Sequence, residues 1–134
     1  MASPLHFEMT AFASSDWRKA VHYLGGIGEE VELRWEAAFA REIKNLCESI
    51  AEQIASPDGF YDQPDEGASL QFSRPIFQQR FQTGKIKARR SSVGVWRIFY
   101  AIDDDDKDGT PDTLRVYAIR HAARPSPDFG NEDG

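Results

Sequence analysis

The chain has 134 residues, of which 40% are hydrophobic and 12% are aromatic. This length suits one compact domain, and the composition is sufficient for a globular core. Apolar runs are too short for a membrane-spanning helix, and residues 1–15 lack the basic and apolar segments of a secretory signal. A soluble cytoplasmic protein is therefore predicted.

The formal net charge of -6 is distributed unevenly. Residues 1–73 carry thirteen acidic and five basic side chains, and residues 125–134 carry three acidic and no basic ones. Two later segments, 74–102 and 113–124, contain no Asp or Glu. Their basic residues are Arg74, Arg80, Lys85, Lys87, Arg89, Arg90, Arg97, Arg115, Arg120 and Arg124. This separation predicts a positive sheet face and an acidic outer side of the helices.

The N-terminal segments predict a strand followed by a short helix. Apolar and polar residues alternate from 5 to 11, which is typical of a strand with one buried face. A helix is predicted over 16–24, with Ser14 and Ser15 as candidate caps. The glycine pair at 25–26 is expected to end it.

A long amphipathic helix is predicted over 29–55. Its apolar residues recur at steps of three and four: Trp35, Phe39, Ile43, Leu46, Ile50 and Ile54. Trp17, Trp35 and Trp96 are expected to anchor the core. Cys47 lies within this helix and is expected to be a buried small residue rather than a reactive thiol. The polar, Pro- and Gly-containing stretch over 58–73 is predicted to be a loop.

The C-terminal half predicts three strands. Residues 85–92 form the first, the apolar and aromatic run over 95–102 forms a central one, and 113–121 forms the last. The acidic segment 103–112 connects the last two. The polar, Pro-containing residues 125–134 are expected to be a disordered tail.

The predicted order is strand, helix, helix, strand, strand, strand. It indicates an α+β fold in which two N-terminal helices pack on one side of a small antiparallel sheet. Residues 1–124 are expected to form this single domain.

Three segments resemble the RelE/ParE superfamily of toxins. The basic stretch 83–90 and the aromatic and Arg-containing run 95–102 are similar to two of that family's strands. The run from Leu114 to Arg124, with its His-Ala-Ala-Arg ending, is similar to the closing strand. The resemblance covers about residues 6–124.

The resemblance implies the toxin of a type II toxin–antitoxin pair, whose partner is a cognate antitoxin. One branch of the family cleaves mRNA on the ribosome as a metal-independent endoribonuclease. The ParE branch inhibits DNA gyrase without catalysis, and an inactive antitoxin-binding domain is a third alternative. No cofactor or metal is expected for any of them.

Cleavage by the ribose 2′-hydroxyl needs a base, an acid and positive charge on the pentacoordinate phosphate. Lys85 and Lys87 are candidates for proton transfer, because clustered cations lower a lysine pKa. Arg97 is the candidate for phosphate stabilisation, since a charge within an apolar strand is costly without a task. His121 is the candidate acid or base, with Tyr100 or Arg120 assisting it. The remaining predicted RNA contacts are Arg89, Arg90, Arg120 and Arg124.

Structural roles are the alternatives for these residues. Arg97 could form an ion pair with Glu36 or Glu42 of the long helix. The basic run that begins at Lys85 could be a solvated edge strand that deters aggregation. His121 could be a surface residue, and Tyr100 is more typical of the core.

The acidic segment matches the opening of a calcium-binding loop. The matching residues are Asp104, Asp106, Asp108, Gly109 and Asp112. However, the twelfth position of such a loop is normally a bidentate Glu, and here it is Arg115. A solvated hairpin loop is therefore favoured over a metal site.

Overall fold

The computed structural model describes residues 2–60, 62–83 and 95–122. Its elements, in chain order, are β1 (His6–Met9), α1 (Ala11–Ile27), α2 (Glu29–Ala55), α3 (Glu66–Phe72), β2 (Phe77–Gln82), β3 (Val95–Asp103) and β4 (Thr113–His121). The predicted α+β class and the order of one strand, two helices and three strands are confirmed. The short helix α3 is an addition to that order.

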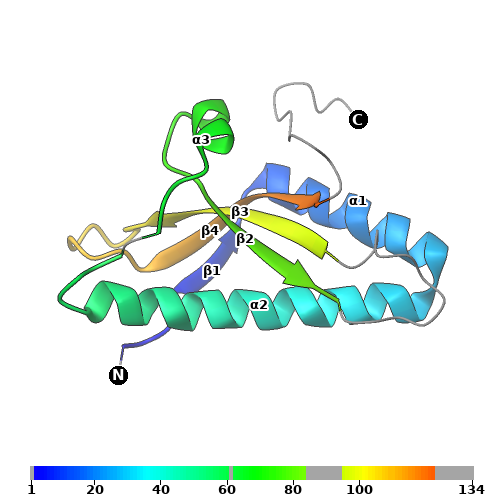
Figure 1. Cartoon of the computed structure of the whole chain (residues 1–134), viewed down its shortest axis with the longest axis horizontal. Coiled ribbons are helices and arrows are strands. Elements are labelled where there is room, and N and C mark those ends of the chain that lie inside the picture. The colour runs from blue at the N-terminus through cyan, green and yellow to red at the C-terminus, as the bar shows by residue number, and fades with distance from the viewer. Residues whose placement is uncertain (1, 61, 84–94, 123–134) are drawn as a thin grey trace.

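The four strands form one sheet in the order β1-β4-β3-β2 (Figure 1). β2, β3 and β4 are antiparallel neighbours, whereas β1 pairs with β4 in parallel, with His6 opposite Thr113. The sheet is therefore mixed, whereas the sequence predicted an antiparallel one. A parallel pair cannot be joined by a tight turn, and here helices α1, α2 and α3 and strands β2 and β3 lie between its members along the chain.

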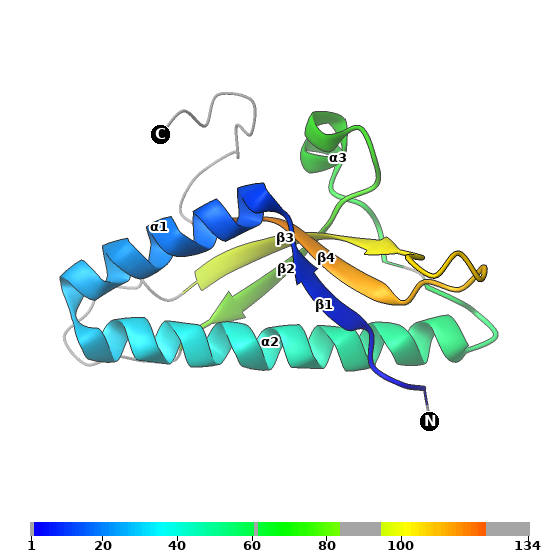
Figure 2. The same ribbon diagram turned by 180° about the vertical axis from the view of Figure 1, so that it is seen from behind.

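One face of the sheet packs against α1 and α2, and we call it the α2 face. Alternate residues of β3 point to it, among them Trp96, Ile98 and Tyr100, all within the main core cluster. Trp35 of α2 is fully buried at its centre, with ring centroids 5.2 Å from Trp96 and 5.8 Å from Phe81. The sheet lies between α2 and α3 in both views (Figures 1 and 2).

The opposite face carries α3, and we call it the α3 face. A smaller core cluster forms there from Ala68, Ile76, Phe99, Ala101 and Ala118. Helix α3 is held in place because the backbone N–H of Ile76 donates to the Ser69 hydroxyl at 2.9 Å. The sheet therefore has a large core on one face and a small one on the other.

The bounds of α1 differ from the prediction at both ends. The helix begins at Ala11 because the Thr10 hydroxyl accepts a hydrogen bond from the Ala13 N–H at 3.1 Å, which places Ser14 and Ser15 inside the helix. It continues through the glycine pair and ends at Ile27, where packing against α2 outweighs the entropic cost of glycine. A Cβ on Gly25 would lie 2.7 Å from Glu32 Oε1, the end of a flexible side chain that could move aside.

The long helix has the predicted bounds, and its predicted apolar face is buried, except that Ile54 is only partly buried. Cys47 is buried as expected, and burial followed by the Glu48 charge raises the pKa of its thiol. Trp17, Trp35 and Trp96 contribute to the main core cluster as predicted.

The loop predicted over 58–73 is wrong in part, because it contains α3. Asp65 begins this helix by accepting a hydrogen bond from the Ala68 N–H at 2.9 Å. β2 was not predicted either. The strands predicted over 95–102 and 113–121 are confirmed as β3 and β4. The strand predicted over 85–92 and the tail over 125–134 lie outside the described residues.

Among the helices that the structure describes, none combines the length and the apolar character needed to cross a bilayer.

Candidate functional site

Three arginines lie side by side across the α3 face. Arg80 of β2 is opposite Arg97 of β3, and Arg97 is opposite Arg120 of β4. Directly opposed residues of antiparallel strands point to the same face, and neighbouring strands are about 4.8 Å apart. We call these three residues the arginine row. It places three guanidinium-bearing side chains on consecutive strands.

Arg120 belongs to a buried ion pair with Asp16 of α1, and only 4% of Arg120 and 7% of Asp16 is exposed. The same Asp16 carboxylate oxygen accepts a hydrogen bond from the Ile119 N–H at 2.9 Å. The Arg120 guanidinium also lies 5.3 Å from the centroid of the Phe12 ring. Arg120 therefore attaches α1 to β4, and this structural role was not foreseen from the sequence.

Arg97 occupies the centre of the row and is 8% exposed. Its guanidinium lies 5.5 Å from the centroid of the Phe99 ring. Burial lowers the pKa of Arg97, the charges of Arg80 and Arg120 lower it further, and the charge of Asp65 opposes them. Even so, an arginine keeps its charge at any physiological pH. Arg97 therefore keeps its charge between Arg80 and Arg120.

The predicted alternative partners of Arg97 lie elsewhere in the fold. Burial raises the pKa of Glu42 while the side chain of Gln79 lowers it, and the neighbouring Glu32 side chain raises the pKa of Glu36. Both glutamates belong to α2, which packs on the other face of the sheet from Arg97. An ion pair between Arg97 and α2 is therefore not the arrangement in this fold.

A second group of charges lies on the same face at the other end of β3 and β4. Asp103 accepts hydrogen bonds from both Arg74 and Arg115. Arg115 also donates to Asp105 at 2.7 Å, and Arg74 donates to the Tyr117 hydroxyl at 2.7 Å. The five described arginines of the basic segments thus share one face, but three of them pair with aspartates. Among the described residues this face is therefore not the continuous positive surface that was predicted.

The structure separates His121 from Arg97. His121 is opposite Trp96, with ring centroids 5.0 Å apart, so it lies on the α2 face at the end of the sheet. Tyr100 is buried in the main core, where burial strongly raises the pKa of its hydroxyl, in agreement with the core alternative. The other predicted site residues, Lys85, Lys87, Arg89, Arg90 and Arg124, lie outside the described residues.

The carboxylates of the acidic loop bind backbone N–H groups of the loop itself. Asp104 accepts from the Gly109 N–H at 2.7 Å, and Asp112 accepts from the Asp106 N–H at 3.0 Å. Lys107 and Gly109 have positive φ, which is typical of tight turns. Within the described ranges, no group of three or more His, Cys, Asp or Glu side chains is arranged to hold a metal ion. These contacts agree with the hairpin-loop alternative.

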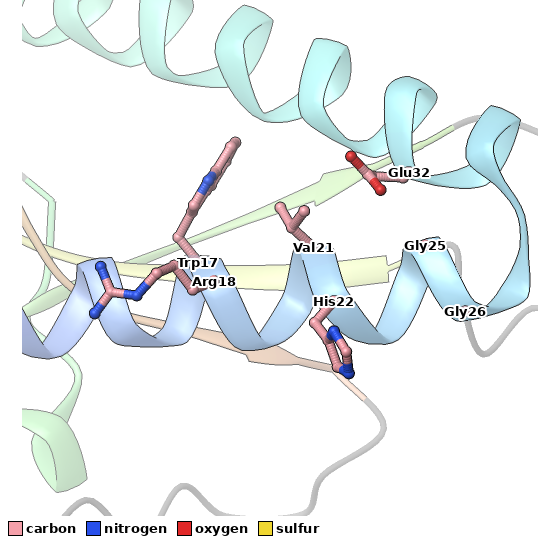
Figure 3. Close-up of a pocket in the computed structure, with 7 residues that line it drawn as sticks. All are labelled: Trp17, Arg18, Val21, His22, Gly25, Gly26 and Glu32. Atoms are coloured by element: carbon pink, nitrogen blue, oxygen red, sulfur yellow. The ribbon is translucent and has the colours of Figure 1, made fainter.

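A groove of about 540 Å³ lies between α1 and α2, away from the arginine row (Figure 3). Trp17 and Val21 point from α1 toward α2, whereas His22 points to the other side of α1. Trp17 also contacts Trp35 and Phe39, so the groove borders the main core. Its lining brings no nucleophile together with a base. The arginine row is therefore the better candidate site.

No protein-family model, no curated protein and no solved structure matches this chain. The resemblance to RelE/ParE toxins therefore rests on the residues quoted above and on the order of the elements.

Proposed function

We propose that this chain is the toxin of a type II toxin–antitoxin pair and that it binds and cleaves mRNA on the ribosome through the α3 face. The observation that carries the proposal is the position of Arg97, between Arg80 and Arg120 on three adjacent strands. The βααβββ order supports the family assignment. The cognate antitoxin and the ribosome are the partners that this function requires.

Arg80 and Arg97 suit RNA because they lie opposite each other on adjacent strands, whereas Arg120 beside them is paired with Asp16. A guanidinium can donate two parallel hydrogen bonds to phosphate oxygens, and it remains charged whatever its surroundings. Arg80 is exposed, so it is accessible to a phosphate, while Arg97 beside it is held in a fixed position. We assign Arg97 the stabilisation of the charge that develops on the pentacoordinate phosphate.

Inhibition of DNA gyrase without catalysis is the second candidate, and one observation favours it. Cleavage needs a base and an acid near the phosphate, yet His121 is on the other face of the sheet from Arg97. A protein that only binds its target needs no such pair. Purified protein should therefore be assayed both for mRNA cleavage on translating ribosomes and for gyrase supercoiling.

The residue test is Arg97→Lys. We expect it to reduce mRNA cleavage by about a hundredfold, because an ammonium cannot reproduce the planar two-point contact of a guanidinium. Arg34→Lys is the matched control, since Arg34 is an exposed residue of α2 paired with Glu30 at 2.9 Å. Equal melting temperatures must first show that both variants are folded.

Three outcomes of these assays are informative. Cleavage that is lost in Arg97→Lys and kept in Arg34→Lys supports the proposal. Cleavage that is equal in all three proteins contradicts the role of Arg97. If the parent inhibits supercoiling and cleaves no mRNA, the gyrase function replaces the proposed one.

A further inference from the structure

Asp65 is held on the α3 face by two elements. Its Oδ1 accepts a hydrogen bond from the Ala68 N–H at 2.9 Å, at the start of α3. Its Oδ2 accepts one from the Gln78 side-chain amide of β2, also at 2.9 Å. The Asp65 backbone N–H donates to the Ile76 carbonyl at 2.6 Å. The carboxylate is therefore fixed in position before any ligand binds.

This carboxylate lies beside Gln78, on the same face of the sheet as the arginine row. Gln78, which it contacts, is opposite Phe99 in the pairing of β2 with β3. The Arg97 guanidinium lies over the ring of that same Phe99, and Arg80 follows Gln78 by two residues on the same face. Asp65 is the acidic residue whose charge raises the pKa of Arg97 against burial and the two neighbouring arginines.

We propose that Asp65 is an internal counter-anion of Arg97, a positioning residue with which an RNA phosphate must compete. The inference rests on the proposed RNA-binding function and defines what ligand the site accepts. A single weak anion gains little binding free energy from Arg97, because Asp65 already compensates part of the charge of that arginine. A polyanion that contacts Arg80 and Arg97 at once gains enough to bind, so the site selects a nucleic-acid strand over isolated phosphate.

A purely structural role as the cap of α3 predicts a different response. Asn caps helices about as well as Asp, so Asp65→Asn should leave α3 and the melting temperature nearly unchanged. The same substitution removes the negative charge beside Arg97. Affinity for RNA and its dependence on salt therefore separate the two roles, because a cap acts on neither.

The experiment measures binding of a single-stranded 2′-O-methyl RNA oligonucleotide, which lacks the attacking hydroxyl, at several salt concentrations. We expect Asp65→Asn to bind about three- to tenfold more tightly than the parent, the effect of one partly screened charge. The slope of log affinity against log salt should also steepen by up to about one, because Arg97 then exchanges a counterion for a phosphate. Glu66→Gln is the matched control, since it removes the next acidic side chain along the chain.

The possible outcomes distinguish the counter-anion role of Asp65 from the proposed RNA-binding function. Tighter binding in Asp65→Asn and no change in Glu66→Gln support the counter-anion role. Equal affinities and slopes in the parent and Asp65→Asn overturn that role and leave the proposed function intact. Equal tightening in both variants shows a general charge effect and also overturns it. If neither the parent nor Asp65→Asn binds the oligonucleotide, the RNA-binding function itself fails and the inference fails with it.

Discussion

The two faces of the sheet are built from alternate residues of the same strands, yet they differ in content. On β3, Trp96, Ile98 and Tyr100 join the main core on the α2 face, while Arg97 and Phe99 lie on the α3 face. The α2 face is lined with aromatic and aliphatic side chains from two long helices. The α3 face is crossed by charges and, among the described residues, is covered by the short helix α3 and by Phe12 and Asp16 near the start of α1. Under the proposed function, stability and binding therefore depend on alternate positions of one strand.

The largest effect on stability is expected from a substitution in the core on the α2 face. Trp35→Ala should reduce the free energy of unfolding by about 3 to 5 kcal/mol, because it leaves a cavity where a fully buried ring contacts Trp17, Phe39, Phe81 and Trp96. Urea denaturation measures this change. Leu70→Ala on α3 is the control. Leu70 is 74% exposed, and its loss should cost less than about 0.5 kcal/mol.

A loss below about 1 kcal/mol in Trp35→Ala would contradict the comparison, since the helices would then contribute little to the stability of the sheet.

A smaller effect is expected where α1 reaches the edge of the sheet. Asp16→Asn should destabilise the protein by about 1.5 to 3 kcal/mol, because it removes the charge that compensates the buried Arg120. Glu30→Gln breaks the exposed pair with Arg34 and should change stability by less than about 0.5 kcal/mol. Equal losses in the two variants would show that burial of the Asp16 pair has no special importance. Urea denaturation of both variants in one buffer makes the comparison direct.

The smallest effect is expected in the acidic loop, which belongs to neither face. The Thr113 hydroxyl, followed by the backbone N–H groups of Asp105 and Asp106, lowers the pKa of Asp112 to about 2 from an ordinary 3.8. A lowered folded-state pKa stabilises the protein above pH 3.8, and this contribution is lost as the pH falls toward 2. The pKa of Asp106 is raised instead, because the charge of Asp112 lies close to it, so the effects of the two groups on stability partly cancel.

Melting temperatures of the parent and Asp112→Asn at pH 6 and pH 2 check this expectation. The parent should melt slightly higher at pH 6, and the difference should be much smaller at pH 2, where about half of the Asp112 carboxylates are protonated. Asp58→Asn, an exposed change of the same charge in another loop, controls for the net charge. A difference as large at pH 2 as at pH 6 would show that the Asp112 carboxylate does not act through its ionised form.

The secondary structure of the long periodic segments was predictable, because the apolar pattern within each segment is enough to determine it. The apolar positions of α2 repeat over its whole length, and β3 and β4 are dense in β-branched and aromatic residues. β2 was missed because Gln79 interrupts its apolar alternation between Phe77 and Phe81, and the pairing with β3 decides its structure instead. α3 depends on contacts with Gln78 and Ile76 that no local pattern contains, although Asp65 is a typical cap residue.

The candidate site was predictable in part for the same reason. Arg97 could be identified because it is a charged residue within an apolar strand, and the alternation of side chains along β3 predicted on which face of the sheet it lies. Its neighbours came from strand register, which brings Arg80 and Arg120 beside it across three strands. The ion pair of Asp16 with Arg120 joins residues 104 positions apart, so sequence charge counts could not find it. The same register places His121 on the other face.

The parallel pairing of β1 with β4 also affects how the protein is synthesised. His6 is paired with Thr113, so β1 leaves the ribosome early and has no partner until β4 has been made. The α1–α2 hairpin joins neighbouring segments and can form well before that. Arg120 completes the arginine row only when β4 is added at the edge of β3. Under the proposed function, a nascent or prematurely terminated chain that stops before Thr113 would therefore be harmless to the ribosome that makes it.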